Sequence, residues 1–196
     1  MIYLIKVLTI LLFFPFSLIA QNEADSIRSM LESRDQEIKE LLGPSGTDYT
    51  QGQRDRLKNI INDVINYRVM AQHALGDTYN DLNEETKEEF VSLFATIIRD
   101  NSLNRLDIYR AEVKYDDITV QGDTADVETT AQLEDVRTSV DYDLRIIDAE
   151  WMITDMWIDG VSTADSYRRQ FQSIIRKRGF DALMESLRKR AARSTT

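Results

Sequence analysis

The sequence predicts an α+β domain, with helices at both ends of the chain and an antiparallel meander of about four strands between them. Apolar residues recur at helical spacing as far as residue 109 and again after residue 162. Between residues 112 and 158 the apolar period is two, which is typical of strands. Because the connections between these alternating stretches are short, the strands are expected to pair antiparallel.

The helical stretches before the sheet have recognisable ends. Gly43-Pro44-Ser45-Gly46 stops the first helix, and Gly76 stops the second. The second helix is expected to carry Val64 and Ile65 on its apolar side. Asn83 is the expected N-cap of the third helix, whose first turns are acidic, as the helix dipole favours. We therefore expect helices over 24–42, 57–76 and 84–98, and a short helical continuation over 103–109.

Four alternating stretches predict the strands. The first contains a turn or bulge at Asp116-Asp117, and Gln121-Gly122-Asp123 turns the chain into the second. In the second and third stretches apolar and polar residues alternate, so each strand has one face in water. The expected strands are 113–120, 125–133, 140–146 and 151–158.

The last predicted strand is apolar on both faces. Strict alternation gives two sets, namely Trp151, Ile153 and Trp157 on one side and Met152, Met156 and Ile158 on the other. Such a strand must be covered twice, by protein or by something that the protein carries.

Two helices follow the sheet. Ser162 is the expected N-cap of the first, with Asp165 three residues later as in a capping box. Gly179 ends that helix, and the last helix leads into a flexible basic tail over 191–196. We expect one domain over 21–190.

Residues 1–20 have the layout of a secretory signal peptide. Lys6 supplies a positive charge, an apolar run follows, and Ala20 offers a small residue at the cleavage position. The apolar run contains Pro15 and is barely long enough for an uncleaved membrane span. The chain has no Cys, so the exported domain depends on packing alone and no lipid can be attached to a cysteine.

Charge is distributed unevenly along the chain, whose net charge is −10. Residues 21–165 hold 14 Lys/Arg against 32 Asp/Glu, whereas residues 166–196 hold nine against two. The acidic body argues against nucleic acid as a partner. The basic C-terminal arm is either a solvated helix surface or a contact for an acidic partner or lipid headgroups.

Candidate catalytic residues are few. His73 is the one histidine, and Asp77 lies four residues later on the same helical face, where it could orient a general base. The chain has neither a Cys nucleophile nor a serine in a nucleophile elbow. A phosphate-binding Gly loop is also absent, so we expect no enzyme and no nucleotide cofactor.

The acidic turns and strands are candidate metal sites. Asp116 and Asp117, with Asp123 and Asp126, are dense enough for calcium, but their spacing matches no calcium loop. Asp141, Asp143 and Glu128 are expected side by side on the polar face of neighbouring strands. Solvated carboxylates explain both groups, so no metal is expected.

Several segments, in order, resemble the MlaC, or toluene-tolerance auxiliary, family. They are Met70-Ala71 with Leu75-Gly76, Leu82-Asn83 with Glu89-Phe90 and Phe94, Val140-Asp141-Tyr142, Trp151 with Asp155, Gly160-Val161-Ser162, Tyr167-Arg168 with Gln170-Phe171, and Gly179-Phe180-Asp181 with Leu183 and Leu187. The resemblance extends over about residues 24–190.

The resemblance implies a curved, nuclear-transport-factor-like sheet whose helices enclose a deep apolar pocket. It implies a monomeric periplasmic carrier of a Gram-negative bacterium, with no cofactor and with phospholipid as cargo. The partners it implies are an outer-membrane lipoprotein–porin complex and an inner-membrane ABC transporter complex with an MCE-domain ring. Such carriers maintain the lipid asymmetry of the outer membrane and contribute to toluene tolerance.

Given that resemblance, apolar and small residues near the predicted sheet and its covering helices are the candidate lipid contacts. They are Tyr67, Met70, Phe94, Ile97, Ile98, Leu103, Leu106, Val127, Thr129, Ala131, Val140, Tyr142, Leu144, Met152, Met156, Val161, Tyr167 and Phe171. Methionines suit chains of variable shape.

Two alternatives remain open from the sequence. The first is an enzyme on a related cone-shaped α+β fold, in which His73 would face the cavity beside a carboxylate. The second is a ligand-free envelope interaction protein, which would have a filled interior and would bind through its acidic body and basic arm.

Overall fold

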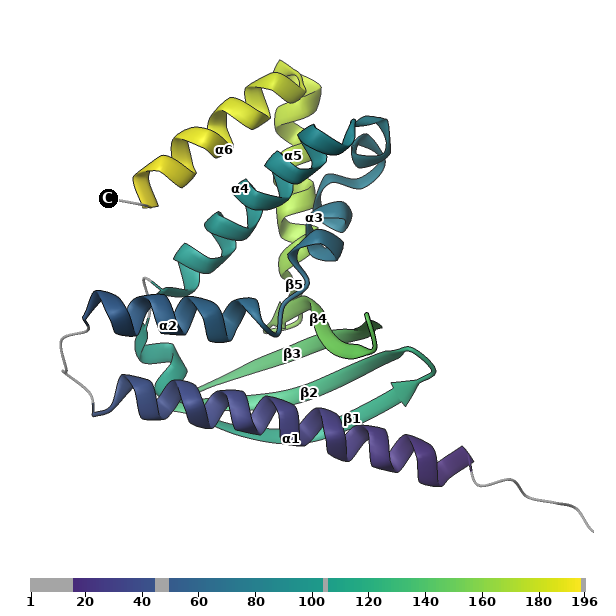
Figure 1. Cartoon of the computed structure of the whole chain (residues 1–196), viewed down its shortest axis with the longest axis vertical. Helices are drawn as coiled ribbons and strands as arrows, with labels where there is room; N and C mark the ends of the chain where they lie inside the picture. Colours follow the sequence, from purple (N-terminus) through teal and green to yellow (C-terminus); the bar gives the residue numbers. More distant parts are fainter. Residues whose placement is uncertain (1–15, 45–49, 104–105, 195–196) are drawn as a thin grey trace, which may run out of the picture.

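The structure is a computed structural model that describes residues 16–44, 50–103 and 106–194 (Figure 1). Its helices are α1 (Phe16–Leu42), α2 (Gln51–Asn62), α3 (Tyr67–Leu75), η1 (Gly76–Asp81), α4 (Glu84–Leu103), η2 (Leu106–Arg110), α5 (Thr163–Arg178) and α6 (Phe180–Ser194). Its strands are β1 (Glu112–Gln121), β2 (Thr124–Leu133), β3 (Val136–Ile147), β4 (Glu150–Ile158) and β5 (Val161–Ser162).

The strands form one antiparallel sheet in the order β1-β2-β3-β4-β5, so the predicted α+β meander is confirmed. A two-residue fifth strand, β5, joins the four expected ones and leads directly into α5. The expected irregularity of the first strand is also confirmed, because the register of β1 against β2 shifts between Tyr115 and Asp117. In Figure 1, α1 lies along β1 and β2, and α4, α5 and α6 form a separate group beyond β4 and β5.

The predicted helix over 57–76 is broken in two. The backbone amide of Ile153 donates to the carbonyl of Val64, and the amide of Asn66 donates to the carbonyl of Ile153, both at 2.8 Å. Ile65 therefore forms a parallel bridge with Ile153, and the expectation that Val64 and Ile65 are helical is wrong. Backbone groups on the buried edge of β4 need partners, and this extended segment provides them. Asn66 then caps α3 by accepting a bond from the amide of Val69.

The predicted orientation of β4 is also wrong. Leu144 pairs with Ile153 but Asp143 pairs with Asp155, so Thr154 is an extra residue in β4. This β-bulge reverses the alternation beyond it, because one added residue turns every later side chain to the other face. Trp151, Ile153, Met156 and Ile158 therefore share one face, and Met152, Asp155 and Trp157 lie on the other.

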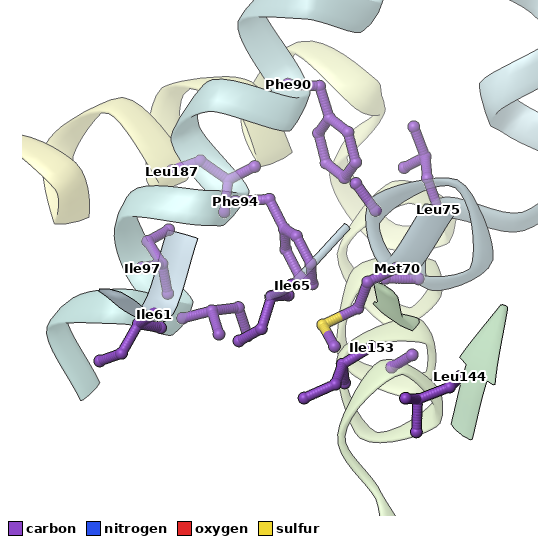
Figure 2. Close-up of a cluster of buried hydrophobic side chains, with 14 of the residues drawn as sticks. Ile61, Ile65, Met70, Leu75, Phe90, Phe94, Ile97, Leu144, Ile153 and Leu187 are labelled. Carbon is purple, nitrogen blue, oxygen red and sulfur yellow. The ribbon is translucent and has the colours of Figure 1, made fainter. Parts of the chain in front are cut away.

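Buried side chains from both groups of helices and from the sheet form one hydrophobic core. Figure 2 shows Met70 of α3 beside Ile153 and Leu144 of the sheet, with Phe94 and Ile97 of α4 on the opposite side of the cluster. Helices α4 and α5 are joined by four aromatic rings whose centroids lie 5.2–6.1 Å apart, namely Phe90, Phe94, Tyr167 and Phe171. The wide apolar stripe predicted from Phe90 to Ile98 is thus the inner side of α4.

The two ends of the chain extend the predicted helices. Residues 1–15 of the predicted signal peptide lie outside the described residues, and α1 begins at Phe16. No helix among the described residues is long and apolar enough to cross a membrane. Helix α6 runs through Ser194 and so includes most of the stretch that the sequence predicts as a flexible tail, since Ala191 and Ala192 are good helix formers.

Candidate functional site

The register of the four long strands divides the sheet into two chemically different faces. We call the face that packs against the core the inner face. Directly paired residues of antiparallel strands lie on the same side, so the inner face is apolar across all four strands. It is formed by Val113, Tyr115, Ile118, Val120, Ala125, Val127, Thr129, Ala131, Val140, Tyr142, Leu144, Ile146, Trp151, Ile153, Met156 and Ile158.

Burial on the inner face falls steadily toward one end of the sheet. On β4, Ile153 is buried, Met156 is partly buried and Ile158 is exposed. On β3, Leu144 is buried, whereas Tyr142 is only partly covered. The apolar surface is therefore continuous from the core to solvent in one direction along the strands.

Four large apolar side chains gather at that same end, and we call them the apolar rim. They are Ile108, Val136, Ile158 and Val161, which are 50%, 65%, 50% and 51% exposed. Ile108 precedes β1, Val136 begins β3, and the other two flank the β4–β5 turn. Antiparallel topology brings the start of β1, the β2–β3 turn and the β4–β5 turn to the same end of the sheet. Exposed apolar side chains at the end of an apolar face are candidates for a binding surface.

Tyrosines lie between the rim and the core. Burial raises the pKa of Tyr67 to about 12, against a smaller opposing effect of the nearby Arg99 guanidinium. Burial also raises the pKa of Tyr142, and the next contribution comes from Tyr115. Tyr67, Tyr109 and Tyr142 are all partly buried and pack against the core cluster. Such amphipathic rings offer both apolar edges and hydroxyl groups.

Most of the candidate lipid contacts come together on the inner face and the helices that cover it. Those buried in the core are Met70, Phe94, Ile97, Ile98, Val127, Thr129, Leu144 and Phe171. Those partly buried are Tyr67, Ala131, Val140, Tyr142, Met156 and Tyr167, and Val161 belongs to the rim. The buried apolar candidates pack against one another in the core cluster.

Three of the candidates stand apart. Met152 lies opposite Arg145 on the other face of the sheet, which the β-bulge in β4 explains. The side chains of Leu103 and Leu106 lie outside the described residues.

The opposite side of the sheet, which we call the outer face, is strongly acidic. Asp126, Asp143 and Asp155 occupy one row across β2, β3 and β4. Burial, together with these neighbouring carboxylates, raises the pKa of Asp143, although the indole Nε1 of Trp157 donates to it at 3.0 Å and opposes the rise. The expected neighbours Asp141 and Glu128 also belong to this face.

A polar pocket of about 350 Å³ lies where the outer face meets α3 and the start of α5. His73 lies in its wall, with Nε2 2.8 Å from Oδ1 of Asp165. The expected partner Asp77 is replaced by a residue 92 positions away in the chain, which no local spacing could indicate. Hydrogen bonding to His73 lowers the pKa of the Asp165 carboxyl. His73 is half exposed and belongs to the polar pocket, so it does not face the apolar interior.

Asp155 fixes the start of α5. Its carboxylate is buried and accepts bonds from the hydroxyl of Ser162 and from the amides of Ala164 and Met156. The expected cap is confirmed, because Ser162 Oγ accepts the amide of Asp165 at 2.9 Å. The role of Asp155 was not predicted, since it depends on the return of the chain through β5.

The acidic turn residues have partners of their own. Asp116 bonds to Lys114 and to Thr130, which lowers the pKa of its carboxyl. In the described ranges, no group of three or more His, Cys, Asp or Glu side chains is arranged to hold a metal ion.

Comparisons with known proteins agree with this architecture. The family model for MlaC protein matches residues 21–189. A crystal structure of a phospholipid-binding protein from Ralstonia solanacearum, in complex with a phospholipid, superposes with a TM-score of 0.73. It is 18% identical and covers 88% of this chain and 98% of its own, so it supports the fold. Among curated proteins, no match was found. The match over residues 21–189 establishes that this chain belongs to the MlaC family.

Proposed function

We propose that this protein binds a phospholipid by its acyl chains and carries it through the periplasm. The observation that carries the proposal is the inner face, whose apolar surface runs without interruption from the core to an exposed apolar rim. Family membership and the phospholipid bound to the Ralstonia solanacearum protein support the same reading.

A carrier of this kind answers a simple physical problem. Each buried CH₂ gains about 0.8 kcal/mol on leaving water, so a two-chain lipid cannot cross an aqueous space rapidly by itself. The protein must therefore cover both chains, and it must release them by direct contact with another apolar site. The rim is the surface through which we propose that the chains pass.

Loading requires the core side chains to separate, because in this structure they pack against one another. Contacts between apolar side chains have no fixed geometry, so an acyl chain can replace them at little cost. Met70 and Met156 contribute flexible thioether chains to this region. We propose that the inner face and the helices above it move apart as the chains enter.

The proposed partners are an outer-membrane lipoprotein–porin complex and an inner-membrane MCE-domain transporter complex, between which the protein would shuttle lipid as a monomer. This would maintain the lipid asymmetry of the outer membrane. Residues 1–20 would direct export, and no cofactor is required.

We propose a binding protein rather than an enzyme. The enzyme alternative requires His73 to face the apolar cavity, whereas His73 is half exposed in a polar pocket on the outer side. Its carboxylate partner Asp165 joins α3 to α5, which accounts for the pair structurally. The packed core matches the filled interior that the ligand-free alternative requires, but that alternative gives the exposed rim no role.

Native mass spectrometry of gently purified protein tests the proposal. We expect one phospholipid per chain, and we expect delipidated protein to take up labelled phospholipid from vesicles. A protein that is purified free of lipid and takes up none from vesicles would contradict the carrier function and favour the ligand-free alternative.

A further inference from the structure

The hydroxyl of Tyr67 is a buried polar atom without a hydrogen-bond partner. Within the described ranges it is the single buried side-chain nitrogen or oxygen atom in that condition. Leaving such a group unpaired has a cost, and phenylalanine would fill the same place without it. An unpaired buried hydroxyl therefore suggests a partner that does not belong to the chain.

The neighbours of Tyr67 are already engaged elsewhere. Arg99 lies over the tyrosine ring, 6.0 Å from its centroid. Its guanidinium, however, donates to Asn62 at 2.9 Å and to Thr96 at 3.4 Å. The ring itself is held at the first position of α3, directly after the cap residue Asn66. Tyr67 thus has a defined place in the fold, and the Arg99 guanidinium over its ring makes its hydrogen bonds to other residues.

Tyr67 lies at the border of the core. Its side chain is partly buried and packs against the core cluster, as do those of Tyr109, which follows the rim residue Ile108, and Tyr142. Tyr142 follows buried Leu144 toward the rim on the inner face of β3. A phospholipid with its chains in the core and its headgroup toward the rim would have its glycerol esters at this depth.

We propose that the Tyr67 hydroxyl donates a hydrogen bond to an ester carbonyl of the carried phospholipid. The inference rests on the proposed carrier function and names a chemical requirement of the same site. A phenol that stays protonated across the physiological range is a donor to a neutral carbonyl oxygen. An ether-linked lipid of the same headgroup and chain length lacks that oxygen.

Competition between ester-linked and ether-linked phosphatidylglycerol tests this directly. Delipidated wild type, Tyr67→Phe and Tyr79→Phe are each equilibrated with vesicles that contain the two lipids in equal amounts. Native mass spectrometry then gives the ratio of ester to ether lipid bound. Both lipids compete for the same folded molecules, so the ratio is independent of how much of a variant is folded. Tyr79→Phe is the matched control, because Tyr79 is also buried but its hydroxyl already accepts a hydrogen bond from Arg68 at 3.4 Å.

We expect Tyr67→Phe to lower the ester-to-ether ratio about three- to tenfold relative to wild type, the range of one net hydrogen bond. Tyr79→Phe should leave the ratio unchanged. An unchanged ratio in Tyr67→Phe, with lipid still bound, would overturn this inference and leave the carrier function intact. If wild type binds neither lipid, both proposals fail.

Discussion

The two faces of the sheet differ in their chemistry and in the way that they contact the helices. The inner face is apolar across four strands and packs against the helices mainly through apolar contacts. Its directed bonds go to α1, where Trp151 donates to Glu23 and the carbonyl of Tyr115 accepts from Arg28. The outer face places Asp126, Asp143 and Asp155 in a row, and directed hydrogen bonds beside it tie α5 to the sheet and α3 to α5. Directed bonds fix a geometry, whereas apolar contacts tolerate a change of partner. We therefore expect the outer side to be rigid and the inner side to exchange its contacts for those of a ligand.

The largest expected effect comes from filling the inner face. Val127→Trp adds an indole among buried side chains, so it should abolish lipid loading at an overpacking cost of about 1–3 kcal/mol. Met152→Trp is the matched control, because Met152 lies on the outer face and the same bulk there should leave loading unchanged. Phospholipid per chain by mass spectrometry is the measurement. Normal loading of Val127→Trp, or equal loss in both variants, would break the distinction between the faces.

The next effect concerns the rigid side. Asp155→Ala leaves the Ser162 hydroxyl and the amides of Ala164 and Met156 without their buried acceptor. We expect a loss of about 3 kcal/mol in the free energy of unfolding, measured by urea denaturation, since each buried unpaired donor costs about 1–3 kcal/mol. Exposed Asp126→Ala should change stability by less than about 0.5 kcal/mol. A similar small effect at Asp155 would mean that the start of α5 is not fixed there.

The sequence predicts which side chains share a face only where polar residues show at which position the apolar alternation shifts. The bulge in β1 is predictable because Asp116 and Asp117 interrupt apolar alternation. The bulge at Thr154 is hidden, because apolar residues on both sides of it fit either alternation equally well. The periodicity of single segments therefore predicts the helices, the strands and the apolar inner face.

The periodicity of single segments cannot predict contacts between residues that are far apart in the sequence. Ile65 is extended because it meets the edge of β4, and His73 meets Asp165 across 92 positions. The buried role of Asp155 and the unpaired hydroxyl of Tyr67 likewise arise only when separate elements come together. The family resemblance, rather than periodicity, pointed to the lipid.

A smaller effect is expected at the rim. Val161→Asp places a charge where acyl chains would pass, so it should slow lipid uptake from vesicles about three- to tenfold while stability changes by less than about 0.5 kcal/mol. Thr119→Asp, on the exposed outer side of β1, adds the same charge away from the rim and should leave uptake unchanged. Fluorescence dequenching of a labelled phospholipid follows the rate. Equal rates in both variants would move the site of exchange away from the β4–β5 turn.

The smallest effect distinguishes the carboxylates of the outer face by pH. Burial and the carboxylates of Asp155 and Asp126 raise the pKa of Asp143, so its charged form is disfavoured in the folded state. That penalty is complete above the folded pKa and disappears as pH falls toward the unfolded value of about 3.9. Asp143→Asn removes the charge and keeps an acceptor for the Trp157 indole. We therefore expect it to be more stable than wild type by a few tenths to about 1 kcal/mol at pH 7, after allowance for solvent screening, and equal to it near pH 4.

Asp165→Asn should have the opposite sign, because the folded pKa of Asp165 is lowered by His73 and its contribution is lost on acidification. Urea titrations at several pH values measure both. If the two variants shift in the same direction, the charges of Asp143 and Asp165 do not act through Asp155, Asp126 and His73, and the outer face and the start of α5 are only solvated surfaces.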